Sequence, residues 1–430
     1  MNKFINEKLL PNIFKFVNLN SVQALKSGVL ATLPLTIVGS ILLLLCNLPI
    51  EGARNFIADS GLKDIFLQGY YATFAILAMV AVIGIAYNYA KIEGQEGLGA
   101  GIIALVLFIL LMSNSIKLDE TTVTDVISKE WTSAKGMIPA IIIGLFVGKF
   151  YSFLLKKGIA IKMPEGVPEG VSKSFASLVP SAIIIIIGLV IYAIFDKVFK
   201  TTMLEWIYKV IQTPLQSITD SLGGVIVIAF TVPFLWLFGV HGATIVSSVM
   251  NPILLANADS NSKLVQQGIE LTVENGGRIV TPQFYDLFIN LSGTGITLGL
   301  VMYLVAFSKS KQCREMGKLA FIPSLFNINE PILFGIPIVM NPILAIPFLI
   351  MPIISGLMLY FAQYFGLVPL FDSVILPWTT PPVISGFIVG GFRTALLQIV
   401  ILVVSFFVYL PFIKKVDMMN LQRENETSNS

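Results

Sequence analysis

The chain has 430 residues, of which 55% are hydrophobic and 12% charged, whereas soluble globular proteins carry about 25% charged residues. This composition, with a mean hydropathy of +0.84, excludes a water-soluble globular protein and indicates a polytopic membrane protein. The net charge of +3 is small and no basic block is present, so we expect no nucleic-acid partner. The single histidine and two distant cysteines, Cys46 and Cys313, predict no metal site and no other cofactor.

The chain opens with KFINEKLLPNIFKFVN at residues 3–18, which mixes apolar and charged side chains and predicts an amphipathic segment over 1–26. Apolar runs of about 20 residues then recur, and each is long enough to cross a membrane as a helix. The predicted crossings are 27–48, 69–90, 98–113, 136–155, 176–195, 222–240, 241–257, 284–307, 338–364 and 391–413. The sequence therefore predicts an all-α polytopic membrane protein with about ten transmembrane helices.

Two further apolar stretches, 319–337 and 372–390, are rich in proline and glycine. They predict re-entrant hairpins, because non-helical backbone at membrane depth must face protein or a wet cavity. The stretch 241–257 is open to two interpretations, a broken crossing or a hairpin. The expected parts of the chain are an N-terminal transmembrane half at 27–196, an amphipathic linker at 197–220, a C-terminal half at 221–415 and a polar, disordered tail at 416–430.

The distribution of basic residues predicts the orientation. If the N-terminus is cytoplasmic, the predicted crossings divide the connecting segments into cytoplasmic and external ones. Lysine and arginine are then more numerous in the cytoplasmic segments than in the external ones. Cytoplasmic loops carry such an excess, so we expect both termini to be cytoplasmic.

Polar side chains interrupt the apolar sequence after residue 220. They are His241, Asn290, Asn327, Glu330, Trp378 and Thr379. An ionisable group in a membrane segment costs at least about 2.5–3.5 kcal/mol, so it usually faces a cavity and serves a function. Amides and acids bind hydroxyl groups, and an indole covers the apolar face of a pyranose ring. These residues therefore predict a sugar site with a few placed polar groups on an apolar lining.

Each of these residues also has a purely structural interpretation. Glu330 could cap backbone N–H groups of its hairpin, and His241 could be a satisfied structural histidine. Trp378 could belong to an interfacial aromatic belt, and Asn290 could pack between helices.

Three motifs carry a family likeness: VHGATIVSSVMNPIL, FIPSLFNINEPILFGIPIVMNP and ILPWTTPPVISGF. They resemble enzyme IIC, the membrane permease component of the bacterial sugar phosphotransferase system, in its lactose/cellobiose/diacetylchitobiose branch. GVLATLPLTIVGSILLL at 28–44 and MPEGVPEGVSKSFASLVP at 163–180 are similar to it too. The likeness runs from about residue 5 to residue 415.

The resemblance implies ten transmembrane helices with two re-entrant hairpins in the bacterial cell membrane. It implies that the N-terminal half forms a homodimer and that the C-terminal half binds a disaccharide and carries it across. A phosphocysteine on the soluble IIB partner then phosphorylates a sugar hydroxyl, usually at C6. The motif glutamate and histidine of the family correspond to Glu330 and His241, which are the expected catalytic residues. Asn290, Trp378, Asn327 and Thr379 lie in family-like contexts and are expected to bind the sugar.

The chain contains no recognisable IIB domain, so we expect IIA and IIB to be separate chains. Whether the permease counts as an enzyme stays open, because the phosphoryl donor is on IIB. An alternative function is a proton-coupled sugar transporter in which Glu330 carries the proton and His241 is its partner. A third interpretation, a membrane sensor or scaffold, fits the polar residues less well.

Overall fold

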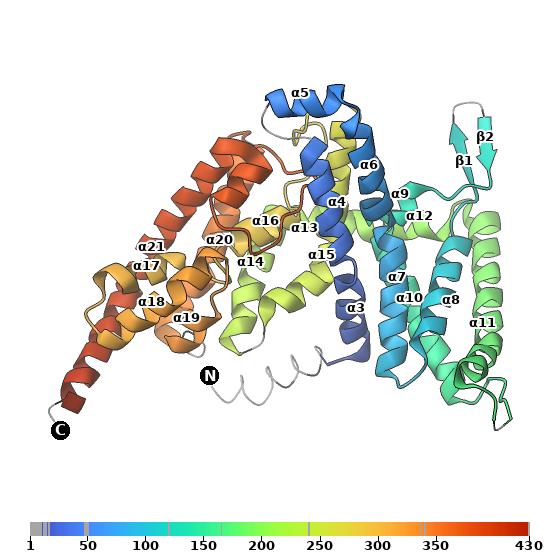
Figure 1. The fold of residues 1–430 in the computed structure, drawn as a ribbon, viewed down its shortest axis with the longest axis horizontal. Coiled ribbons are helices and arrows are strands. Elements are labelled where there is room, and N and C mark those ends of the chain that lie inside the picture. Colours follow the sequence, from blue (N-terminus) through green and yellow to red (C-terminus); the bar gives the residue numbers. More distant parts are fainter. Residues whose placement is uncertain are drawn as a thin grey trace. The chain divides into compact units, whose positions relative to one another are not determined.

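The computed structural model describes residues 11, 15, 18–46, 51–118, 121–164, 166–239, 241–336, 338 and 341–428. Within these residues, six helices are long and apolar enough to cross a membrane, and a bent helix pair makes a seventh if it is counted as one span. The predicted multi-span helical membrane protein is thus confirmed (Figure 1). Most of the predicted amphipathic segment 1–26 lies outside the described residues.

The chain forms two compact units, which we describe separately. The first contains residues 1–46, 58–216 and 248–256, and the second contains residues 47–57, 217–247 and 257–430.

The first unit is a helical bundle (Figure 1). Its elements are α3 (Asn20–Leu30), α4 (Leu33–Cys46), α6 (Leu62–Thr73), α7 (Leu77–Ile92), α8 (Gly97–Leu110), β1 (Ser115–Leu118), β2 (Thr121–Thr124), α9 (Lys129–Thr132), α10 (Met137–Lys156), α11 (Glu169–Ile194) and α12 (Met203–Ile207). Helix α5 (Glu51–Asp59) and helix α13 (Thr213–Thr219) lie where the chain passes between the units.

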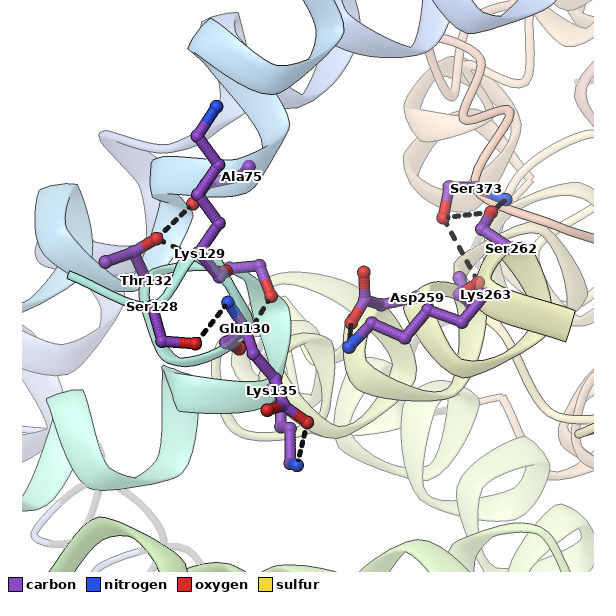
Figure 2. A network of polar contacts seen from close by, with 12 residues as sticks. Ala75, Ser128, Lys129, Glu130, Thr132, Lys135, Asp259, Ser262, Lys263 and Ser373 are labelled. Carbon is purple, nitrogen blue, oxygen red and sulfur yellow. Dashed lines mark hydrogen bonds and ion pairs between the residues drawn. The ribbon is translucent and has the colours of Figure 1, made fainter. Parts of the chain in front are cut away.

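Glycines let the neighbouring helices approach α7 closely. A Cβ atom on Gly28 of α3 would come within 2.4 Å of the Ile85 side chain, and one on Gly148 of α10 would come within 2.6 Å of Tyr89 Cβ. Small residues allow such approaches between membrane helices. Where α9 meets this bundle, the Thr132 hydroxyl donates to the Ala75 carbonyl at 2.6 Å (Figure 2).

The second unit contains the segments from which the sequence predicts the sugar site. Its helices are α14 (Leu222–Leu237), α15 (Gly242–Gln266, whose middle belongs to the first unit), α16 (Pro282–Phe284), α17 (Leu298–Phe307), α18 (Lys311–Leu325), α19 (Glu330–Gly335), α20 (Pro342–Tyr364) and α21 (Ile384–Ser428). Helix α21 is interrupted by non-helical backbone at Gly390 and Gly391.

A buried serine pair holds the loop before α21 against α15. The Ser262 hydroxyl donates to Ser373 Oγ at 2.7 Å, and the Ser373 N–H donates to Ser262 Oγ at 2.9 Å (Figure 2). The irregular residues between α20 and α21 are therefore fixed by side-chain hydrogen bonds in place of regular secondary structure.

The structure corrects two expectations and decides between the two interpretations of residues 241–257. Residues 284–307 do not form one helix, because a π-helical turn at Tyr285–Ile289 gives way to irregular backbone before α17 begins. Residues 241–257 form no hairpin, since they belong to the continuous helix α15. The tail is not disordered up to Ser428, because α21 continues to that residue. The antiparallel hairpin β1–β2, which pairs Ser115 with Thr124, was not expected either.

The helical tail is held by a buried carboxylate. Asp417 is 1% exposed. Its Oδ1 accepts hydrogen bonds from the Ser308 hydroxyl at 2.5 Å and the Ser310 N–H at 3.0 Å. Its Oδ2 accepts from the Lys309 N–H at 2.9 Å and the Tyr303 hydroxyl at 3.2 Å. The carboxylate thus satisfies backbone N–H groups that the turn between α17 and α18 leaves without helical partners.

We expect Asp417→Asn to destabilise this end of the second unit. In either orientation of the new amide, its N–H group points at a hydrogen-bond donor from which the carboxylate accepted a hydrogen bond. Hydrogen bonds to charged groups contribute about 1.5–3 kcal/mol each, so their loss is destabilising. Thermal unfolding in detergent should show a fall in Tm of about 4–8 °C. The matched control is Glu426→Gln, an exposed carboxylate on the same helix. Equal Tm values for the two variants would contradict this account of the tail.

Candidate functional site

The Asn-Ile-Asn-Glu-Pro motif lies in the turn between α18 and α19. Helix α18 ends at Leu325, and Glu330 opens α19 with Pro331 directly after it. Proline fits the start of a helix because its fixed φ suits the first turn and no N–H is needed there. Asn327 has a φ of 62°, a left-handed conformation that asparagine tolerates better than most residues. The motif therefore ends one helix and starts the next with Glu330 at the junction.

The structure brings the two predicted catalytic residues together. His241 Nε2 lies 3.9 Å from Glu330 Oε1, and the side chains are 51% and 43% exposed. The separation exceeds a hydrogen bond, which ends near 3.2 Å. Two polar groups thus lie close together without a direct hydrogen bond, and both side chains are partly accessible.

Local backbone geometry orients the histidine. His241 caps the N-terminus of α15, where its Nδ1 accepts a hydrogen bond from the Thr244 N–H at 3.3 Å and lies 2.8 Å from the Thr244 hydroxyl. A ring nitrogen that accepts a hydrogen bond carries no proton, so in the neutral ring the hydrogen is on Nε2. The nitrogen near Glu330 is therefore a hydrogen-bond donor.

Asn327 is buried, and backbone groups occupy its amide. Its Oδ1 accepts from the Ser292 N–H at 2.7 Å, and its Nδ2 donates to the Trp378 carbonyl at 2.6 Å and the Thr380 carbonyl at 2.9 Å. An asparagine amide has only two hydrogens to donate. The structure thus shows Asn327 joining three loops, and its expected contact with the sugar stays a prediction.

Asn329, which flanks the acid in the Asn-Ile-Asn-Glu-Pro motif, and Gln398, which the sequence did not identify, act in the same way. Asn329 donates to the Thr294 carbonyl at 2.6 Å and to Thr297 Oγ1 at 3.1 Å. Gln398 Oε1 accepts from the Val383 N–H at 2.6 Å, and its Nε2 donates to the Leu287 carbonyl at 3.0 Å. Buried amides that bond mainly to backbone groups indicate a structural role, but a sequence does not show what an amide bonds to.

The other predicted sugar-binding residues lie on the loops that Asn327 joins. Asn290 follows the π-helical turn and is partly exposed, and its Nδ2 donates to the Tyr285 carbonyl at 3.2 Å. The Trp378 side chain is mostly exposed, with 54% of the residue accessible, and Thr379 beside it is partly buried. No contact places any of these side chains against Glu330, so their part in sugar binding stays a prediction.

The backbone around this site is strained. Ser292, Ile296 and Val383 have positive φ values of 57°, 54° and 72°, which are uncommon for residues other than glycine and unfavourable for β-branched ones. Such strain persists only where surrounding contacts hold it, and it clusters at functional sites. The hydrogen bonds of Asn327 and Gln398 to these loops supply that restraint.

The described residues contain no group of three or more His, Cys, Asp or Glu that could hold a metal ion. A cavity of about 270 Å³ lies in the first unit, and apolar side chains such as Ile109, Leu110 and Leu189 line most of it. Its lining has no carboxylate and no histidine. The pair of His241 and Glu330 is therefore the better candidate for chemistry.

Comparison with known proteins identifies the family. Residues 26–352 match the family model described as phosphotransferase system, EIIC. The chain belongs to this EIIC family. This confirms the resemblance seen in the sequence motifs, and it makes the protein a multi-span permease of the phosphotransferase system.

Relatives of this EIIC chain match over almost its whole length. The lichenan permease IIC component of Bacillus subtilis (strain 168) is 36% identical, over 99% of this chain and 96% of the relative. The cellobiose-specific EIIC component of Geobacillus stearothermophilus is 34% identical, over 96% of this chain and 94% of the relative. The crystal structure of ChbC, the IIC component of an N,N'-diacetylchitobiose-specific system, matches with a TM-score of 0.93 and 35% identity, covering 98% of this chain and 99% of that one.

We expect Asn327→Ala to weaken sugar binding without touching either catalytic candidate. The substitution removes the amide that joins the turn at Ser292 to the loop at Trp378, and it puts alanine at a positive φ. Cellobiose affinity, measured by titration calorimetry in detergent, should fall about tenfold or more, since unpaired backbone groups cost about 1–3 kcal/mol each. Asn425→Ala, at an exposed position on α21, is the control. Unchanged affinity for the Asn327 variant would show that the loops hold together without this amide.

Proposed function

We propose that this EIIC permease binds a disaccharide in its second unit, carries it inward and presents one hydroxyl, that on C6, to phosphocysteine on IIB. The observation that carries the proposal is the pair of His241 and Glu330, whose Nε2 and Oε1 atoms are 3.9 Å apart and whose side chains are partly accessible. The family match supports the transport function, and the pair supports the place where the hydroxyl binds.

The gap between the two side chains has the size and polarity for one hydroxyl group. Two hydrogen bonds of about 2.8 Å can bridge atoms up to about 5.6 Å apart through one oxygen. His241 Nε2–H donates to the hydroxyl oxygen, and Glu330 accepts the hydroxyl hydrogen. A donor and an acceptor in these positions select a hydroxyl over a carbonyl or an amine and fix its lone pair in one direction.

The same arrangement suits the transfer step. The hydroxyl oxygen attacks phosphorus, an O–P bond forms, the S–P bond breaks, and the cysteine leaves as a thiolate. Phosphoryl transfer depends mainly on positioning and charge stabilisation. Glu330 orients the hydroxyl and accepts its proton as a general base, while IIB supplies the phosphoryl group.

The substrate class follows from the relatives. Their names include lichenan, cellobiose and diacetylchitobiose, and these sugars share β-glycosidic linkages between pyranose rings. We therefore propose a β-linked disaccharide such as cellobiose or diacetylchitobiose. The exposed indole of Trp378 offers a flat apolar surface for a pyranose ring, and Asn290 and Thr379 lie on the neighbouring loops as hydroxyl partners.

For the membrane arrangement we propose about ten crossings with both termini cytoplasmic, and two re-entrant hairpins at 319–337 and 372–390. The shorter apolar helices α8 and α17 would supply crossings beyond the six long ones. The turn of the Asn-Ile-Asn-Glu-Pro motif and the irregular loop at Trp378 support the hairpins, since broken helices mark binding sites in transporters. We further propose that the N-terminal half forms a homodimer.

The proposed phosphoryl chain comprises IIA and IIB subunits on separate polypeptides. The lichenan and cellobiose relatives are named as IIC components and are covered almost completely. A lactose-specific relative of Staphylococcus aureus (strain COL) is named an EIICB component, and the chain covers 71% of it. The chain is 36% and 34% identical to the first two relatives and 30% identical to the lactose-specific one, and this greater similarity supports the proposal of separate subunits.

The proposal predicts strict dependence on phosphorylated IIB. Membrane vesicles that contain this permease should release phosphorylated cellobiose inside only when phospho-IIB is supplied, and an uncoupler should have little effect. A β-linked sugar should compete and maltose should not. Accumulation of unmodified sugar without any phosphoryl donor, abolished by an uncoupler, would establish the proton-coupled alternative in its place.

Glu330→Gln should slow phosphorylation by about 10²-fold or more, since general acid–base catalysis contributes about 10²–10⁴-fold. Glutamine keeps the size of the side chain but cannot take the proton. The rate is measured with saturating sugar and phospho-IIB in detergent or vesicles. The control is Glu315→Gln, an exposed carboxylate on α18 that pairs with Lys318. Near-normal phosphorylation by the Glu330 variant would reduce this residue to a helix cap.

A further inference from the structure

Trp236, near the end of α14, lies against the catalytic pair. The residue is 5% exposed. Its ring centroid is 4.6 Å from that of His241, with the planes tilted by 49°. Aromatic rings interact favourably at centroid separations of about 4.5–7 Å, so the indole packs against the imidazole, whose Nε2 lies 3.9 Å from Glu330 Oε1.

The same indole contacts the helix that carries the acid. Its ring meets the ring of Phe334 edge-on, with centroids 6.3 Å apart. Phe334 follows Glu330 by one helical turn in α19, and residues with this spacing lie on the same helix face. Trp236 therefore contacts both the ring of His241 and a residue on the Glu330-bearing face of α19, all within the second unit.

Two contacts together restrict the imidazole. The Thr244 N–H and hydroxyl hold Nδ1 at the start of α15, and these contacts restrain the ring at that atom. The packing of the indole against the imidazole restrains the rest of the ring. With both contacts present, Nε2 is directed toward Glu330 Oε1.

The indole N–H does not account for the presence of tryptophan here. Among the described residues, Trp236 Nε1 is buried and has no hydrogen-bond partner. Leaving a buried donor unpaired is unfavourable, so the position is better explained by the size and flat face of the ring. A leucine at this position would fill part of the space but has no flat aromatic surface. A phenylalanine would keep a flat aromatic surface and has no N–H donor to leave unpaired.

We propose that Trp236 is a positioning residue that sets the imidazole of His241 against Glu330, and thereby the direction in which the bound hydroxyl is held. This inference rests on the proposed function, because it assigns the role of a neighbour to the same catalytic pair. Trp236 itself need not touch the sugar.

The chain has a single histidine, so His241 can be observed directly. Protein labelled with ¹⁵N-histidine, purified with a tag that contains no histidine, gives imidazole signals from this residue alone. In the wild-type protein we expect one narrow set of signals with Nε2 protonated, and upfield ring-current shifts of the imidazole C–H protons. Trp236→Leu should abolish the ring-current shift and broaden or average the ¹⁵N signals, and Trp236→Phe should restore one narrow set. The matched control is Trp206→Leu, which removes a tryptophan of the first unit that packs edge-on against Phe195.

The rate of phosphorylation provides the second measurement. We expect Trp236→Leu to lower kcat about tenfold or more, since small losses of alignment are costly in positioned reactions, and to change KM by less than about threefold. Trp236→Phe should recover most of kcat. If the leucine variant does not fold, the wild-type ring-current shift and the phenylalanine variant still decide the matter.

The outcomes separate the two proposals. Imidazole signals in Trp236→Leu that match those of the wild type, or no ring-current shift in the wild type, would overturn the positioning role. So would a fall in kcat that Trp236→Phe does not relieve. If the imidazole signals change as expected while Glu330→Gln phosphorylates at the normal rate, the positioning role holds and the proposed function of the pair fails.

Discussion

The second unit depends on hydrogen bonds from buried amide side chains to backbone groups that no helix satisfies. Helices are interrupted around Ser292, between α18 and α19, and before α21, and each break leaves N–H and C=O groups without helical partners. Asn327, Asn329 and Gln398 satisfy several of these groups directly. In an apolar surrounding an unsatisfied backbone group is costly, so these amides make the broken helices possible.

This arrangement explains why an acid stands beside two asparagines. Asn327 and Asn329 hold the turn, and Glu330 is left with a partly exposed carboxylate that faces His241. Trp236 and Thr244 hold the imidazole from its covered side. Neighbouring polar residues thus have different tasks. The asparagines hold the backbone in place, and His241 and Glu330 provide a donor and an acceptor that a sugar hydroxyl can bridge.

Hydropathy predicted most long helices, and the motifs predicted the pairing of His241 with Glu330, because both depend on residue type along the chain. The break after Ile289 was missed because the apolar residues on both sides of NLSGTGIT at 290–297 give the whole stretch the length of a membrane crossing. The glycines and polar side chains of this segment are compatible with a break, and the tertiary hydrogen bonds of Asn327 and Asn329 show where the backbone turns. The helical tail was missed because its polar composition resembles a disordered segment, while its order comes from Asp417 bonding to residues distant in sequence. Trp236 could not be distinguished from a tryptophan facing lipid.

The most direct test of the account is whether one sugar hydroxyl bridges His241 and Glu330. Affinity is measured for cellobiose and for its analogue in which hydrogen replaces the C6 hydroxyl of the ring that is phosphorylated, on the wild-type protein and on Glu330→Gln. The account predicts that the wild type binds the analogue about tenfold more weakly, and that the difference largely disappears in the variant because the two changes remove the same interaction. Equal affinity of the wild type for both sugars, or an equal loss in both proteins, would contradict it.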